Sequence, residues 1–295
     1  MNAGKTFSIR PGVIPKMDDR KLLLKMNSGI SVMSAFVNWK GAALALDYRM
    51  HISVSEGDMK DNQWNIRRIL SILRREYGRE SDLKVTVERK IPAGMGLKSS
   101  SALVSGIVKA YFTFNDMDVG TDEIVSVSSK ISREIKISAT GAADDLYASL
   151  TGGLCITDNR KSILLKRYNI KEKQYIIITS GSKRSSYDFG KMDLSFLKNA
   201  YARMGQRLNS YNFEDIAIMN GFYLSSITGF EIPGDILKPL RFNIMGINGK
   251  GPSTFLQYDN PKTVERDCKL LDKMRINFIV ASSTNLPFSC EWENG

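Results

Sequence analysis

One loop constrains what this chain can fold into more than any other feature of the sequence. Residues 91–102 read Ile-Pro-Ala-Gly-Met-Gly-Leu-Lys-Ser-Ser-Ser-Ala. Apolar residues alternate with polar ones over 82–89, which predicts a strand before the loop, and recur at helical spacing over 101–114, which predicts a helix after it. A strand, a glycine-rich turn and a helix in this order form the setting that a phosphate-binding loop needs.

The residue types in this loop suit an anionic ligand. Gly94 and Gly96 allow close backbone approach and conformations closed to other residues. The helix start offers free amides, the serines at 99–101 add hydroxyls, and Lys98 adds a positive charge. It is not a Walker A loop, because Leu97 rather than glycine precedes the lysine. Taken alone, the loop is equally compatible with a glycine-rich turn and a serine N-cap.

Two further segments carry candidate chemistry. Residues 140–145 read Thr-Gly-Ala-Ala-Asp-Asp, and the small residues leave space beside two carboxylates that can hold a proton or a cation. By itself this segment also fits a solvated turn or helix cap. Residues 248–253, Asn-Gly-Lys-Gly-Pro-Ser, lie between two predicted strands and alone read as a hairpin turn.

Composition excludes several other chemistries. The one histidine, His51, leaves no histidine-based triad, and the cysteines at 155, 268 and 290 lack metal-ligand spacing and are expected to be reduced. No apolar run is long enough for a membrane helix and no signal peptide is evident, so we expect a cytoplasmic protein with no membrane partner. The net charge of +11 suits anionic ligands, but basic residues are spread along the chain, so nucleic acid is not the expected partner.

The remaining pattern predicts two α+β domains joined around 160–172. Strands are expected within 29–54 and at 175–179, 242–247, 254–258 and 276–281, and helices at 62–77, 121–134, 191–208, 214–228 and from 260 onward. The predicted division is an extension at 1–25, an N-terminal domain at 26–165 and a C-terminal domain at 166–295.

Together, the three segments resemble the kinases of the galactose, homoserine, mevalonate and phosphomevalonate (GHMP) family, from about residue 31 to residue 281. Within the family, the sequence at 96–102, the acid pair at 140–145 and Lys-Gly-Ala-Ala at 40–43 look most like the archaeal shikimate kinase branch. The resemblance implies an α+β fold, with a ribosomal S5 domain 2-like N-terminal domain and a ferredoxin-like C-terminal domain. It also implies ATP, Mg²⁺ and the small-molecule substrate shikimate as ligands.

The resemblance assigns roles to individual residues. It implies Asp145 first and Asp144 second as the catalytic aspartate that orients the substrate hydroxyl and accepts its proton, because Asp145 lies seven residues before Gly152 as in mevalonate-type relatives. ATP phosphates are expected on Pro92, Ala93, Gly94, Met95, Gly96, Leu97, Lys98, Ser99, Ser100, Ser101 and Ala102.

The resemblance also implies a metal site and a partner for the acids. Glu134 lies eleven residues before Asp145, the spacing of the magnesium-binding glutamate in mevalonate-type members, and would act with Ser100 or Ser101. Glu134 is equally compatible with a surface acid at a helix end. Lys40 could pair with the acids or be an ordinary surface lysine. Substrate contacts are expected from Asp145, Gly249, Gly251, Ser253, Lys183 and Arg184, with less support for Arg241.

Two features leave the acceptor open. Trp39 stands where small residues are expected and could narrow the substrate pocket, and residues 1–25 have no counterpart at the usual family start. A sibling kinase acting on homoserine, pantoate or mevalonate is one alternative. A basic RNA-binding protein that shares the N-terminal fold is the other.

Overall fold

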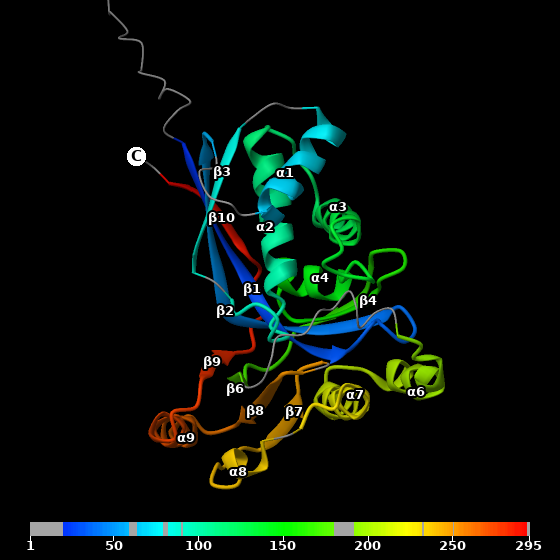
Figure 1. Cartoon of the computed structure of the whole chain (residues 1–295), viewed down its shortest axis with the longest axis vertical. Coiled ribbons are helices and arrows are strands. Elements are labelled where there is room, and N and C mark those ends of the chain that lie inside the picture. The colour runs from blue at the N-terminus through cyan, green and yellow to red at the C-terminus, as the bar shows by residue number, and fades with distance from the viewer. Residues whose placement is uncertain are drawn as a thin grey trace, which may run out of the picture.

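The computed structural model describes residues 20–58, 64–78, 82–89, 91–179, 192–231, 233–249 and 251–293. Two β-sheets lie one above the other in Figure 1, each with its own helices. The strand order is β10-β1-β2-β4-β5 in the first sheet, with β3 also paired to β2, and β7-β8-β6-β9 in the second. Among the described residues, no helix is long and apolar enough to cross a membrane.

The first sheet is built on two long antiparallel strands. Its strands are β1 (Lys21–Met33), β2 (Lys40–Glu56), β3 (Leu83–Arg89), β4 (Leu154–Asp158), β5 (Ile163–Tyr168) and β10 (Ser289–Glu293). The pairing of β1 with β2 slips between Met26 and Ser28 and again between Ser31 and Met33. Such irregularities bend and twist strands. As a result, one half of β2 pairs with β3 and the other half with β4.

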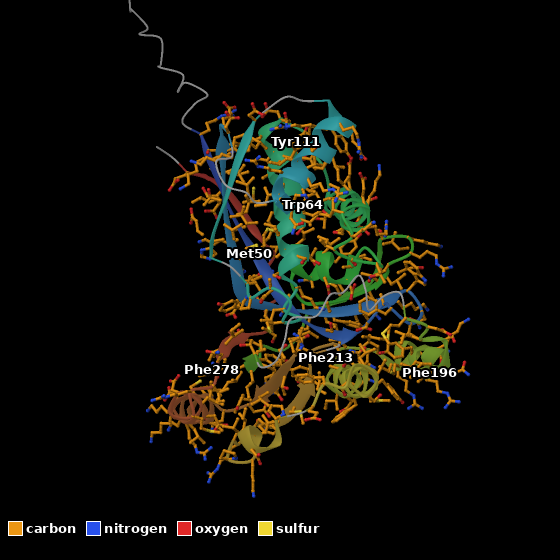
Figure 2. The ribbon with its side chains drawn as sticks, viewed as in Figure 1. Met50, Trp64, Tyr111, Phe196, Phe213 and Phe278 are labelled. Carbon is orange, nitrogen blue, oxygen red and sulfur yellow. The ribbon has the colours of Figure 1, made fainter. Side chains whose placement is uncertain are left out.

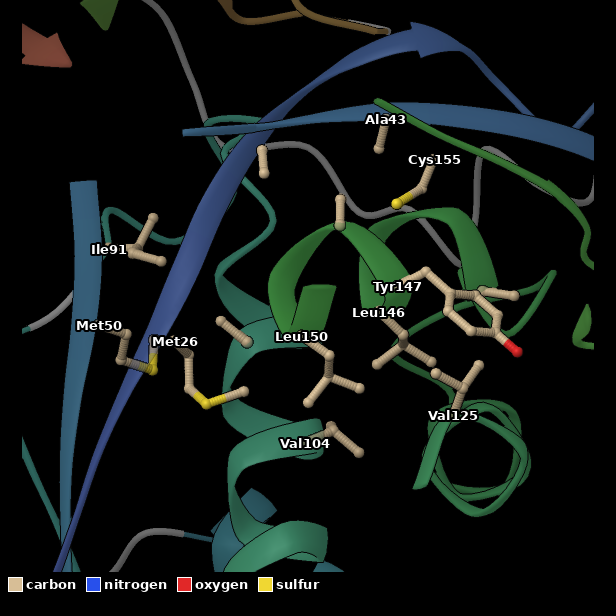
Figure 3. Close-up of a cluster of buried hydrophobic side chains, with 14 of the residues drawn as sticks. Met26, Ala43, Met50, Ile91, Val104, Val125, Leu146, Tyr147, Leu150 and Cys155 are labelled. Carbon is tan, nitrogen blue, oxygen red and sulfur yellow. The ribbon is translucent and has the colours of Figure 1, made fainter. Parts of the chain in front are cut away.

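Four helices cover one face of this sheet (Figure 1). They are α1 (Trp64–Tyr77), α2 (Ser99–Phe114), α3 (Thr121–Glu134) and α4 (Ala143–Thr151). Figure 3 shows Met26 and Met50 of the sheet on one side of α2, and Val104 of α2 on its other side, near Leu146 and Leu150 of α4. All five side chains are buried, which fixes the start of α2 and the start of α4 relative to each other.

The second sheet forms the ferredoxin-like domain that the resemblance implied. Its strands are β6 (Gln174–Thr179), β7 (Ile244–Ile247), β8 (Ser253–Tyr258) and β9 (Phe278–Ser282), and all pairs are antiparallel. Its helices are α6 (Lys198–Arg207), which follows a 3₁₀ turn at Ser195–Leu197, α7 (Phe213–Thr228), α8 (Gly234–Leu237) and α9 (Pro261–Lys273). Helix α7 contacts both β7 and β1, so it joins the two domains.

Two details differ from the sequence expectations, and the structure decides a third that the sequence left open. The first sheet recruits β10 from the end of the chain, so a single boundary at 165 does not separate the two domains. The predicted extension at 1–25 ends too late, because β1 already begins at Lys21; residues 1–19 lie outside the described residues. The acid pair lies in the first turn of α4, which the sequence pattern left open between a turn and a helix cap.

Candidate active site

A cavity of about 310 Å³ brings the three sequence motifs together. The glycine–serine loop, the acid-pair segment and the glycine loop after β7 each contribute to its wall, and the end of β1 closes it. Its lining includes Ser31, Ser34, Ala35, Phe36, Gly94, Gly96, Lys98, Ser99, Ser100, Ser101, Lys136, Ser138, Thr140, Ala142, Asp144, Asp145, Asn248 and Gly249. The wall is thus rich in hydroxyl and charged groups, as expected for a polar, charged ligand.

The glycine–serine loop has the backbone conformation that its glycines predict. Gly94 (φ 75°) and Gly96 (φ 77°) both occupy the left-handed region that favours glycine. Leu97 is buried and anchors the loop in the core, while Ser253 donates a hydrogen bond of 2.6 Å to the Met95 carbonyl. The start of α2, where the first amides of a helix lack partners within the helix, lines the cavity, as anion binding requires.

Lys98 connects the loop to the acid pair. It adopts φ 66°, and its ammonium lies 3.0 Å from a carboxylate oxygen of Asp145 and donates to the Ser31 hydroxyl. Lys40, the lysine assigned to the acids by resemblance, is exposed, opposes Asp158 in the β2–β4 register and is not among the cavity's lining residues. The cation beside the acids is therefore Lys98.

Asp144 is the buried member of the pair. Only 5% of it is exposed, Asn159 donates a 2.8 Å hydrogen bond to its carboxylate, and Gly41 packs so close that a Cβ there would lie 2.6 Å from the Asp144 carboxyl carbon. Burial, followed by the charge of Asp145, raises the pKa of Asp144 to about 7, although Lys98 and Asn159 oppose this. The two acids therefore have different environments, one buried and one paired with lysine.

The raised pKa of Asp144 predicts a pH-dependent stability. From about pH 4 to 7 the folded chain keeps a proton on Asp144 that the unfolded chain releases, so this group lowers the free energy of unfolding as pH rises, by on the order of 4 kcal/mol. Urea unfolding of wild type and Asp144→Asn at pH 5 and pH 8, without nucleotide or magnesium, measures this. Wild type should lose stability relative to the variant at pH 8; an unchanged difference between the two pH values would contradict the assignment.

The glycine loop after β7 contributes unequally to the cavity. Gly249 lines it, whereas Gly251 packs against Phe230 and the Ser253 hydroxyl is used to hold Met95. Asn248, which the sequence analysis did not single out, is fully buried and lines the cavity. The sequence signal for Asn248 was its position directly before Gly249, but a hairpin turn explains an asparagine at that position equally well.

Several predicted ligand residues lie elsewhere. Glu134 turns away from the cavity, and its carboxylate accepts a 3.0 Å hydrogen bond from Arg75. The structure therefore does not place Glu134 at the cavity, contrary to the expectation from its spacing. Ser132 and Lys136 line the cavity, and Glu134, which lies between them in the sequence, is on the opposite side of the helix end. Arg241 is also absent from the lining. Lys183 and Arg184 lie outside the described residues.

The rest of the predicted loop supports the site indirectly. Ala102 is buried in the first turn of α2, Pro92 is half-buried and Ala93 is exposed beside a second cavity. Trp39 does not line the main cavity; its ring lies beneath the Arg160 guanidinium, 5.4 Å from it, at another surface hollow. The structure thus gives no sign that Trp39 narrows the main cavity.

The second cavity, of about 320 Å³, adjoins the first through Ser99 and Ser100. Its other lining residues are Met50, Trp64, Asn65, Ile66, Val87, Ile91, Ala93 and Leu103, which make it predominantly apolar. Figure 2 labels Met50 and Trp64, and the Trp64 side chain is 58% exposed at the start of α1. Sequence reasoning missed Trp64, whose signal was a tryptophan within the predicted helix at 62–77; its exposure beside the glycine–serine loop appears only in the structure.

Comparison with known proteins agrees with this geometry. Residues 65–153 match the family model of the GHMP kinases N terminal domain. A shikimate kinase of Thermoplasma acidophilum is 34% identical over 79% of this chain and 85% of its own, and one of Pyrococcus furiosus is 30% identical over 82% and 93%.

Solved structures show the same fold. The mevalonate kinase of Methanococcus jannaschii aligns with a TM-score of 0.68 over 89% of this chain and 98% of its own, at 16% identity. A homoserine kinase of Cytophaga hutchinsonii aligns with a TM-score of 0.65 over 97% and 100%, also at 16% identity. Fold and site together define a kinase of the GHMP class. Within that class, the chain belongs to the family of the archaeal shikimate kinases.

Proposed function

We propose that this chain transfers the terminal phosphoryl group of ATP to a hydroxyl group of shikimate. The observation that carries the proposal is the Lys98–Asp145 pair, 3.0 Å apart, beside the glycine–serine loop and inside one cavity. A carboxylate to receive a hydroxyl proton and a cradle for phosphates are the two parts that phosphoryl transfer needs. The two shikimate kinases described above support shikimate as the acceptor. The cytoplasm is the proposed place of the reaction.

ATP fits across the two adjoining cavities. Its phosphates would accept hydrogen bonds from the amides at the start of α2 and from the serine hydroxyls, next to the positive end of the helix dipole. The apolar cavity at Trp64 and Met50 offers a surface for the adenine ring. Ser99 and Ser100 line both cavities, so they would lie where base and phosphates meet.

Replacing Trp64 by alanine should therefore weaken ATP binding. Base–aromatic stacking is worth about 1–3 kcal/mol, so we expect the dissociation constant to rise about 5- to 150-fold while shikimate affinity is unchanged. Calorimetric titration with each ligand measures this. Trp292→Ala is a matched control, because that tryptophan packs on Phe114 away from both cavities. If Trp64→Ala binds ATP with wild-type affinity, the adenine ring does not bind in this cavity.

The donors in the main cavity fit a magnesium ion bound together with phosphates. No cluster of three or more histidine, cysteine or acidic residues capable of holding a metal occurs in the described part of the chain. Mg²⁺, however, commonly takes one or two protein oxygens and completes its shell with phosphates and water. The Ser100 hydroxyl and a carboxylate of the acid pair both lie at the cavity wall and would supply these protein oxygens. Bound there, the ion would neutralise charge on the phosphates.

The chain's own residues account for the remaining chemistry. Asp145 would orient the shikimate hydroxyl and accept its proton, and Lys98 holds that carboxylate in place through its ion pair. The loop amides stabilise the negative charge that spreads over the transferred phosphoryl group. Lys136 adds a second ammonium to the cavity wall for anionic groups of either ligand. Lys183 and Arg184 stay predictions for the shikimate carboxylate.

The test is an ADP-release assay with magnesium-ATP against shikimate, homoserine, pantoate and mevalonate. We expect turnover with shikimate and a kcat/KM for it well above that for the other acceptors. A preference for another acceptor would leave the assignment of the nucleotide site intact but would show that shikimate is not the substrate. Absence of turnover with all four, together with salt-dependent binding of RNA, would favour the RNA-binding alternative.

A further inference from the structure

Asn248 is a buried residue whose side chain is only half used by the protein. It follows β7, has no exposed surface, and its Oδ1 accepts a 2.9 Å hydrogen bond from the Ser31 backbone N–H. A backbone N–H can only donate, so the oxygen of the amide must face Ser31. This contact fixes the orientation of the side chain and leaves the NH₂ group on the opposite side.

The NH₂ group of Asn248 has no hydrogen-bond partner among the described residues. It lies at the cavity wall beside the phosphate loop, where a Cβ placed on Gly96 would be 3.1 Å from Nδ2. A buried donor without an acceptor is unfavourable, and such groups in native proteins are usually satisfied by a ligand, water or protein. The position of this donor indicates a ligand that offers acceptors next to Gly96.

We propose that Asn248 Nδ2 donates a hydrogen bond to the terminal phosphoryl group of the bound nucleotide. This rests on the proposed function, since it places ATP phosphates on the glycine–serine loop. Phosphoryl oxygens are charged acceptors without a competing donor, and Gly96 belongs to the loop that holds them. Lys98 approaches the same space from the first domain, whereas Asn248 belongs to the second. The transferred group would therefore be held from both domains.

The backbone tie and the ligand contact can be separated by three variants. Asn248→Asp keeps an oxygen for the Ser31 N–H but loses the donor, and Asn248→Ala loses both. Asn220→Ala is the matched control. Asn220 is fully buried, and its Oδ1 accepts a 2.9 Å hydrogen bond from the Ser34 N–H, yet it does not line the cavity. Asn220→Ala therefore removes a similar hydrogen bond near the end of β1 without removing a donor from the cavity.

The measurement is the calorimetric affinity for ADP and for a non-hydrolysable ATP analogue, with magnesium, alongside the melting temperature. A hydrogen bond to a charged group predicts that both Asn248 variants lose about 10- to 100-fold in affinity for the ATP analogue. Asn248→Ala should keep its ADP affinity, and Asn220→Ala should keep the wild-type ratio of the two affinities even if its melting temperature falls. We also expect kcat with shikimate to fall about 10²- to 10³-fold in both Asn248 variants.

Two results would overturn the proposal. If Asn248→Asp behaves as wild type while Asn248→Ala is impaired, the residue only ties the backbone of Ser31. If the ratio of ATP-analogue to ADP affinity is unchanged in both variants and shikimate affinity falls instead, the donor serves the acceptor substrate. Failure of the wild type to phosphorylate shikimate would refute the proposed function, while the nucleotide affinities would still decide the role of Asn248.

Discussion

Replacing Asp145 by asparagine should lower kcat with shikimate by about 10²- to 10⁴-fold, the usual contribution of a positioned acid–base group. Asparagine keeps the size of the side chain but cannot take the hydroxyl proton. The ion pair with Lys98 is also lost, yet that lysine retains its hydrogen bond to the Ser31 hydroxyl, so the loop should stay in place. We therefore expect ATP affinity close to wild type.

Steady-state kinetics and ATP titration of Asp145→Asn check this prediction. Asp272→Asn in α9 is a control, because it removes an exposed carboxylate in the second domain, away from the cavity. A rate for Asp145→Asn close to wild type would show that it is not the base. Asp144 would then be the next candidate, as the sequence already ordered them.

Replacing Lys98 by methionine should have an effect of similar size, about 10²- to 10³-fold on kcat, because one side chain serves two functions. Its ammonium holds Asp145 and Ser31, and it adds positive charge where the phosphoryl group is expected. Methionine preserves much of the aliphatic stem but neither contact. Unlike Asp145→Asn, this variant should also bind ATP more weakly.

Kinetics and ATP titration of Lys98→Met and Lys130→Met distinguish the loss of a positive charge inside the cavity from the loss of a positive charge at the surface. Lys130 is an exposed lysine that forms a 2.7 Å ion pair with Glu76 on the helical face of the first domain. Surface pairs of this kind contribute little, so Lys130→Met should be nearly silent. Equal losses in the two variants would contradict a specific role for Lys98.

The local features of the fold and of the phosphate loop could be predicted because they depend on short-range patterns. The alternation at Leu83, Val85 and Val87 became β3, and the positive φ of Gly94 and Gly96 followed from residue type. The ferredoxin-like fold of the second domain followed from the family resemblance and is confirmed, with the strand order β7-β8-β6-β9. The pairing of β10 with β1 was missed because it joins segments from opposite ends of the chain.

The partners of the site residues were harder to predict, since they depend on side-chain direction in three dimensions. Spacing alone assigned Glu134 to the metal, but the turn at the end of α3 directs it to Arg75. The resemblance placed Lys40 beside the acids. In the structure its neighbour Gly41 packs against the Asp144 carboxyl group, and Lys98 forms the ion pair with Asp145. Asn248 carried no signal beyond its place before a glycine, because its role depends on a contact with Ser31 across the domain boundary.

The most direct test of the whole account is ³¹P NMR of the wild-type enzyme with magnesium-ATP and shikimate. Transfer inside the described cavity predicts that the γ-phosphate resonance of ATP disappears while a phosphate monoester of shikimate and ADP appear in equal amounts. Asp145→Asn, under the same conditions, should leave ATP unchanged over that time. Release of inorganic phosphate without a shikimate ester, or no consumption of ATP by the wild type, would contradict the account.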